Sequence, residues 1–175
     1  MEGGFNVANP DMVSGPNTHR PEHSFVLRVV QPGLAGLMDG SISTLAPIFA
    51  TAFATQNTRT TFLVGVASAV GAGISMAFSE GLSDDGVLTG RGHPIRRGIV
   101  TGSTTLIGGI GHTLPFLLTN LSAALLVAFV VVGIELIAIA LIRHRYFSIS
   151  LWISVVQVVI GGLLVFAAGV FIGGR

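Results

Sequence analysis

Residues 121–142 read LSAALLVAFVVVGIELIAIALI, an apolar stretch in which Glu135 is the one charged side chain. A helix needs about 20 consecutive apolar residues to cross the hydrocarbon core of a bilayer. Strands of a membrane barrel would instead alternate polar and apolar residues, and this stretch is apolar on all sides. It therefore predicts a transmembrane α-helix.

Four further stretches have a similar length and character, over residues 32–53, 61–80, 99–118 and 149–172. Hydrophobic residues make up 50% of the 175 residues, the mean hydropathy is +0.79, and 10% are charged, against about 25% in an ordinary soluble domain. We therefore predict an all-α polytopic membrane protein with five transmembrane helices over residues 26–175. Residues 1–25 are polar and rich in Gly, Pro and Asn, which predicts a disordered cytosolic tail.

The composition also excludes several classes of function. The formal net charge of +1 gives no support to a nucleic-acid partner. Cysteine is absent, which removes disulfides, thiolate metal sites and cysteine nucleophiles. Within the predicted spans there is no pair of histidines at helical metal-binding spacing and no serine next to a histidine. We expect a protein of the lipid bilayer that is not an enzyme and has no permanently bound cofactor.

The arginines predict the orientation, because basic residues accumulate on the cytosolic side of a membrane. Seven fall on one side of the five predicted spans, and the other side has Arg59 and Arg175. The seven are Arg20, Arg28, Arg91, Arg96, Arg97, Arg143 and Arg145. The N-terminus is therefore expected in the cytosol and the C-terminus on the far side. An odd number of spans argues against an internal inverted repeat and favours a pathway between two copies of the chain.

Polar side chains inside the spans are candidates for function, because a charge at the bilayer centre costs about 2.5–3.5 kcal/mol on insertion scales. Asp39 lies about 11 Å inside the first span, and Ser43 shares its helix face. Met76 and Glu80 share a face of the second span. The predicted metal ligands are Asp39, Met76, Glu80 and Glu135, and the predicted polar residues of the pathway are Ser43 and Gln157.

Glu135 has two interpretations. Its predicted depth matches that of Asp39, Met76 and Gln157, which predicts one shared polar layer. Alternatively, Glu135 bonds Gln157 within one chain and only fixes helix packing. His112, nearer the far side, is a candidate proton relay or metal contact, because its charge changes near neutral pH. A structural histidine bonded to a neighbouring carbonyl is the alternative.

Three motifs resemble the vacuolar iron transporter family: Asp39-Gly40 in the first span, GISMAFSE over residues 73–80, and Arg96-Arg97-Gly98 opening a third span that ends in Leu114-Pro115-Phe116. The resemblance covers residues 30–173. Its second half is most similar to the membrane domain of bacterial membrane-bound ferritin-type iron exporters. The resemblance implies five spans and a homodimer in the bacterial inner membrane, with the metal path at the dimer interface. It also implies that Fe²⁺, and often Mn²⁺, leaves the cytosol in exchange for protons, with Asp39, Met76 and Glu80 at the family's metal positions.

The chain departs from this family where metal would be collected. Ser68 stands where plant and parasite members carry a glutamate, and Glu135 is our candidate replacement. In place of a long Glu-rich insert, the loop after the second span offers Asp84, Asp85 and His93 for weak cytosolic capture. Either this weak capture or a separate cytosolic ferritin-like protein as a partner would fill the gap. The alternative function is a non-transporting membrane anchor or assembly subunit for an iron-handling partner.

Overall fold

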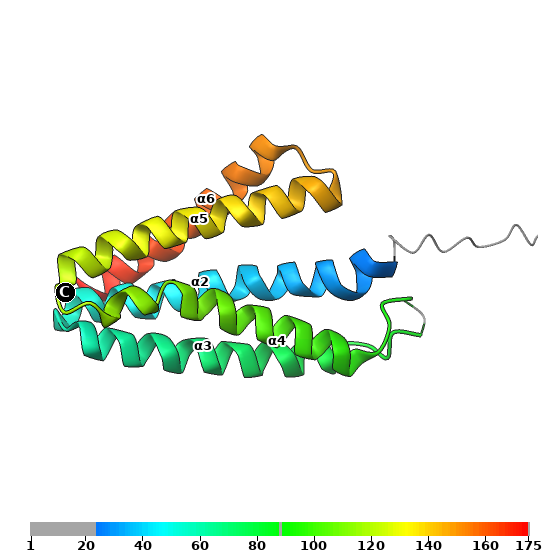
Figure 1. Ribbon diagram of the computed structural model, residues 1–175, viewed down its shortest axis with the longest axis horizontal. Helices are drawn as coiled ribbons and strands as arrows, with labels where there is room; N and C mark the ends of the chain where they lie inside the picture. The colour runs from blue at the N-terminus through cyan, green and yellow to red at the C-terminus, as the bar shows by residue number, and fades with distance from the viewer. Residues whose placement is uncertain (1–23, 88, 175) are drawn as a thin grey trace, which may run out of the picture.

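The computed structural model describes residues 24–87 and 89–174, and these residues form helices joined by short connections (Figure 1). No strand occurs among them. The predicted tail, residues 1–25, lies outside the described residues except for its last two. The elements in chain order are a π-helical turn η2 (Val26–Val30), α2 (Gln31–Thr55), α3 (Thr58–Gly81), α4 (Pro94–Gly111), a 3-10 turn η3 (Leu114–Leu117), α5 (Leu121–Phe147) and α6 (Leu151–Gly173).

Capping residues set where several helices begin and end. The side chains of Asn57 and Asn120 each accept the backbone N–H three residues further on, at 2.9 Å, and so open α3 and α5. Pro94 occupies the first position of α4, where its missing N–H costs nothing. Gln56 and Ser148 follow α2 and α5 in the left-handed conformation, with φ of 52° and 54°. The chain therefore turns sharply at these points and the helices run back alongside one another.

Glycines let the helices of the bundle come close together. A Cβ at Gly40 of α2 would overlap the carbonyl oxygen of Thr105 in α4. A Cβ at Gly102 of α4 would lie 2.6 Å from the carbonyl oxygen of Gly73 in α3, and one at Gly173 of α6 would overlap that of Ala50 in α2. Small residues at helix contacts are typical of membrane bundles. As a result α2 packs between α4 and α3 on one side and α6 on the other, as Figure 1 shows.

Within the described residues, four helices are long and apolar enough to cross a membrane: Val26–Thr55, Thr58–Gly81, Leu121–Phe147 and Leu151–Gly173. They correspond to four of the five predicted stretches, and their outer faces carry exposed apolar side chains such as Leu126, Ile137 and Leu164. The all-helical architecture and its compatibility with a membrane are thus confirmed. Five spans are not, because α4 does not reach the same apolar character.

The stretch predicted as a continuous span over residues 99–118 is built differently. The helix begins earlier, at Pro94, and ends at Gly111. A turn at His112 and Thr113 and the short η3 complete the stretch. Two effects explain the difference: Pro94 favours a helix start, and Pro115, which lacks an N–H, favours a new turn over a continued α-helix. Apart from Arg97, the buried face of α4 is made of small and hydroxyl-bearing residues, which lowers its hydropathy.

One end of the bundle gathers nearly all the arginines that the structure describes, and we call it the arginine end. At this end α2 begins, the loop of residues 82–93 joins α3 to α4, and α5 turns into α6 (Figure 1). Arg59 lies at the opposite end, at the start of α3. The arginines of the arginine end are Arg28, Arg91, Arg96, Arg97, Arg143 and Arg145.

Candidate functional site

A histidine lies at the centre of the bundle between three helices. His112 follows the last turn of α4, and its side chain is 1% exposed. Its Nε2 lies 2.5 Å from the Thr44 hydroxyl of α2, and its Nδ1 lies 3.1 Å from the Glu135 carboxylate of α5. The Glu135 side chain is 12% exposed. Both ring nitrogens therefore have a partner, one from each neighbouring helix.

The Thr44 hydroxyl has two partners within hydrogen-bond distance. It lies 2.7 Å from the carbonyl oxygen of Gly40 as well as beside His112 Nε2. A hydroxyl has one proton to donate. If that proton goes to Gly40, the Thr44 oxygen accepts from Nε2–H, and if it goes to Nε2, the ring proton lies on Nδ1 and is donated to Glu135.

The contact between His112 Nδ1 and Glu135 needs a proton between the two atoms, because at 3.1 Å one of them must donate. The donor is either the ring N–H of His112 or the acid O–H of Glu135. A histidine and a carboxylate held together in this way can each bind and release a proton. We call this buried pair the His112–Glu135 unit.

The interpretation in which Glu135 bonds Gln157 is wrong. Gln157 of α6 accepts from Arg143 Nη2 at 2.7 Å. Glu135 instead reaches α4 beside Gly108, where a Cβ would lie 3.1 Å from its Oε1. The absent side chain at Gly108 leaves space for the carboxylate, so Glu135 turns toward His112 and away from α6.

Asp39 and Met76 lie on the adjacent antiparallel helices α2 and α3, and both are half-buried. Thr44 and Ala69 mark a common level, because a Cβ at Gly109 would lie 2.9 Å from the Thr44 side chain and 2.7 Å from that of Ala69. Counting back along each helix from this level places Asp39 and Met76 within about 3 Å of the same depth. Ser43, on the face of Asp39, is exposed and donates to the Asp39 backbone carbonyl at 2.6 Å. The structure thus keeps the predicted carboxylate and thioether at one depth.

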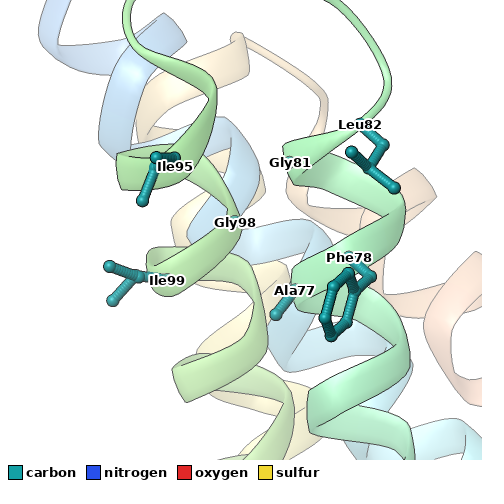
Figure 2. A pocket seen from close by; sticks show the side chains of 7 residues that line it. All are labelled: Ala77, Phe78, Gly81, Leu82, Ile95, Gly98 and Ile99. Carbon is teal, nitrogen blue, oxygen red and sulfur yellow. The ribbon is translucent and has the colours of Figure 1, made fainter.

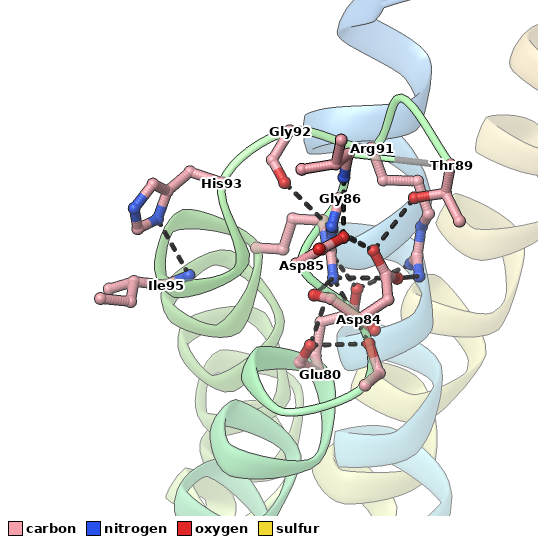
Figure 3. A network of polar contacts seen from close by, with 12 residues as sticks. Glu80, Asp84, Asp85, Gly86, Thr89, Arg91, Gly92, His93 and Ile95 are labelled. Carbon is pink, nitrogen blue, oxygen red and sulfur yellow. Dashed lines mark hydrogen bonds and ion pairs between the residues drawn. The ribbon is translucent and has the colours of Figure 1, made fainter.

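Glu80 and Asp84 form an ion-pair network with Arg91 and Arg97 at the arginine end (Figure 3). Glu80 accepts from Arg91 at 2.7 Å and from Arg97 at 2.9 Å. Asp84 pairs with Arg91 at 3.1 Å and with Arg97 at 3.2 Å. The Arg97 side chain is 1% exposed and also donates to the carbonyl oxygens of Gly92 and Asp84. Two carboxylates and two guanidiniums balance each other, so the network has no net charge.

The ion pairs of this network affect the pKa of Asp84, one of the predicted capture residues. Partial removal from water acts to raise the pKa of Asp84, but hydrogen bonds from Thr89 and Gly86 and the charges of Arg97 and Arg91 together lower it below its usual 3.8. Asp84 is therefore ionised and paired at neutral pH. Glu80 and Asp84 would have to leave their arginines to bind a metal ion.

Asp85 and His93, the other predicted capture residues, are exposed and have local structural contacts. Asp85 accepts the backbone N–H of Val87 at 2.9 Å, and His93 Nδ1 accepts that of Ile95 at 3.3 Å and so caps α4. Across the part of the chain that the structure describes, no three acidic, histidine or cysteine side chains gather as a metal site. Of the predicted carboxylate ligands, Glu80 instead pairs with arginines and Glu135 with His112.

Sequence reasoning missed three residues of these sites. Arg97 and Arg91 counted only as markers of orientation, although two carboxylates four residues apart at a helix end signal a need for cationic partners. Thr44 had no signal, because a threonine in an apolar helix commonly bonds its own backbone. Only the crossing of α2 and α4 shows that it also meets His112.

Comparisons with known proteins add no identification: no protein family, curated protein or solved structure matches this chain.

Proposed function

We propose that this protein moves a divalent metal ion, Fe²⁺ or Mn²⁺, out of the cytosol in exchange for protons. The observation that carries the proposal is the His112–Glu135 unit, a hydrogen-bonded histidine–carboxylate pair buried in a bundle of membrane-length helices. Ionisable groups are costly in such a place and commonly mark ion pathways and proton relays. The motifs around Asp39 and Met76 resemble vacuolar iron transporters, and this resemblance is the reason for proposing a metal as the ion exchanged for protons.

The metal site in this proposal lies between two copies of the chain. One copy brings Asp39 and Met76 to one depth but gathers no set of three acidic or histidine ligands among its described residues. A homodimer would supply two carboxylates and two thioether sulfurs. Carboxylate oxygen suits Mn²⁺, and the softer sulfur adds affinity for a borderline ion such as Fe²⁺. Ser43, exposed beside Asp39, would line the approach.

Charge repulsion would couple the metal to the proton. Thr44, which holds His112, is five residues beyond Asp39, a rise of about 7.5 Å along α2. At a separation of roughly 10 Å and an effective dielectric constant of 20, each unit of charge interacts by about 1.5–2 kcal/mol. A divalent ion at Asp39 would therefore favour proton loss from the His112–Glu135 unit, and reprotonation would favour metal release.

The proposed topology has five crossings, with α4 as the fifth. Its 18 residues would reach about 27 Å, close to the 30 Å of a hydrocarbon core. Its polar face is buried against α2 and α3, while Ile95, Ile99 and Ile107 are exposed toward lipid. The arginine end would face the cytosol of a bacterial inner membrane. There Asp85 and His93 stay exposed for weak capture, and a ferritin-like partner would deliver the metal.

Metal flux into proteoliposomes tests this proposal. The purified chain should carry Fe²⁺ faster when a pH gradient drives protons the opposite way. Asp39→Asn, which removes the charge and keeps the shape, should reduce flux to the leak of empty liposomes, because a neutral amide cannot replace the ionised carboxylate as a ligand for a divalent ion. Ser75→Ala on α3, exposed and outside the proposed path, is the control and should keep full flux. Full flux in Asp39→Asn would overturn the metal path, and no flux in the wild type would favour the anchor or assembly subunit.

Glu135→Gln tests the proton side separately. The glutamine amide can donate to His112 Nδ1, so the hydrogen bond and the fold should survive while the shared proton is lost. We expect downhill metal flux to continue and its acceleration by a pH gradient to disappear. Glu135→Leu, which leaves the ring nitrogen unpaired, should unfold at a lower temperature. An unchanged response of Glu135→Gln to the gradient would show that the unit does not carry the coupled proton.

A further inference from the structure

A basic pocket of about 440 Å³ lies at the arginine end, between η2 and the start of α4. Its polar lining comes from Arg28, Arg91, His93, Arg96 and Arg97. Its apolar lining comes from Val29, Ile99 and Val100. The pocket therefore has both a cationic and an apolar lining. Of the residues in the proposed metal path, the pocket shares only His93, a proposed capture residue.

The positive charge of this pocket is not fully balanced. Glu80 and Asp84 neutralise Arg91 and Arg97. Arg28 and Arg96 are exposed, and neither pairs with a carboxylate among the residues that the structure describes. The N-terminus of α4, an 18-residue helix, adds the partial positive charge of its dipole. The pocket is therefore suited to an anion.

One glycine positions an arginine at the pocket, and one buried donor points to a bound oxygen acceptor. Gly92 has a φ of +77°, and a Cβ there would lie 3.0 Å from Cδ and Nε of Arg28. This glycine allows the Arg28 side chain to lie across the loop at the pocket. The Nε of Arg91 is buried and has no hydrogen-bond partner in the described chain. A buried donor without an acceptor is costly, and a phosphate oxygen in the pocket is a suitable acceptor.

An apolar groove adjoins the basic pocket. Two hollows of about 270 and 300 Å³ lie between α3 and α4, and Figure 2 shows the first, with Phe78 and Ala77 on one side and Ile95 and Ile99 on the other. Neither hollow has a charged residue in its lining. Ile99 lines the basic pocket and both hollows, so the three meet at this side chain.

We propose that an anionic phospholipid occupies this site, with its phosphate in the basic pocket and an acyl chain in the groove between α3 and α4. Basic pockets between membrane helices bind anionic headgroups. A free phosphate matches the charge of the pocket but leaves the apolar groove empty, whereas an amphiphile fills both. The proposal requires that the bundle lies in a membrane and is independent of metal transport.

Lipid retention by the purified full chain tests this site. The protein would be titrated in neutral detergent with phosphatidylglycerol or with phosphatidylcholine, and bound lipid measured by native mass spectrometry and by the rise in unfolding temperature. We expect preference for phosphatidylglycerol in the wild type. The double variant Arg28→Gln/Arg96→Gln should bind roughly 30-fold more weakly, because each arginine near an anionic surface contributes about fivefold. Both side chains are exposed, so the variant should fold.

Arg145→Gln is the matched control, because Arg145 is exposed at the same end and lies outside the pocket. It should bind phosphatidylglycerol like the wild type. Ile99→Gln, at a side chain 61% exposed, should weaken lipid retention without changing charge. Equal loss in Arg145→Gln would reduce the effect to general surface charge and overturn the site. Equal protection by inorganic phosphate, or equal binding of phosphatidylcholine, would overturn the assignment to an anionic lipid.

Discussion

Replacing Arg97 with methionine should destabilise the protein by about 2–4 kcal/mol, because it removes the buried member of the network and leaves Glu80 and Asp84 to share Arg91 alone. Methionine keeps much of the apolar volume of arginine, so the loss of stability measures the effect of the missing charge and hydrogen bonds. Arg97 also donates to backbone carbonyls of the loop between α3 and α4, and those acceptors lose their donor as well. Thermal and denaturant unfolding in neutral detergent, followed by circular dichroism, measures the effect.

Arg96→Met is the matched control for this prediction. Arg96 is the adjacent residue, is exposed and has no carboxylate partner within the described residues. Without anionic lipid, its replacement should change stability by no more than about 0.5 kcal/mol. Arg97→Lys should recover little, because an ammonium group cannot reproduce the fork of donors that reaches Glu80 and Asp84 together. Equal stability of Arg96→Met and Arg97→Met would show that the network does not hold the loop.

Gly40→Ala should be the most damaging of the glycine substitutions in α2. The added methyl group would overlap the carbonyl oxygen of Thr105, and both groups belong to rigid helices. Overpacking typically costs about 1–3 kcal/mol and more where backbone must move. Separation of α2 from α4 would also disturb the Thr44–His112 contact, since Thr44 bonds the Gly40 carbonyl. We therefore expect a lower unfolding temperature together with loss of the pH-gradient effect on flux.

Gly71→Ala and Gly133→Ala are the controls for Gly40→Ala. A Cβ at either position meets no atom within 4 Å. Alanine in a helix interior is favoured over glycine by about 0.5–1 kcal/mol, so both variants should be neutral or slightly more stable. If Gly40→Ala behaves like these two, α2 and α4 do not pack as closely as the structure indicates.

The sequence predicted the long apolar helices well because membrane insertion depends on local composition. The apolar character of residues 121–142 predicted a helix without any information on which helices pack against it, and α5 begins at the predicted residue, Leu121. The limits of α4 were harder to predict, because its polar face can lie within the bundle only where α2 and α3 cover it. A helix covered by other helices does not need a continuous apolar sequence, so a hydropathy pattern cannot place its limits.

For the charged residues, too, the sequence and the tertiary structure determine different properties. The sequence by itself determined that Asp39, Glu80 and Glu135 stand in or beside apolar helices and need an explanation. Only the tertiary structure decided their partners: Arg91 and Arg97 for Glu80, and His112 for Glu135. These contacts join residues from different helices, and an ion pair or hydrogen bond depends on distance in space. Composition and spacing along the chain therefore determine which residues require partners, and helix packing determines which partners they receive.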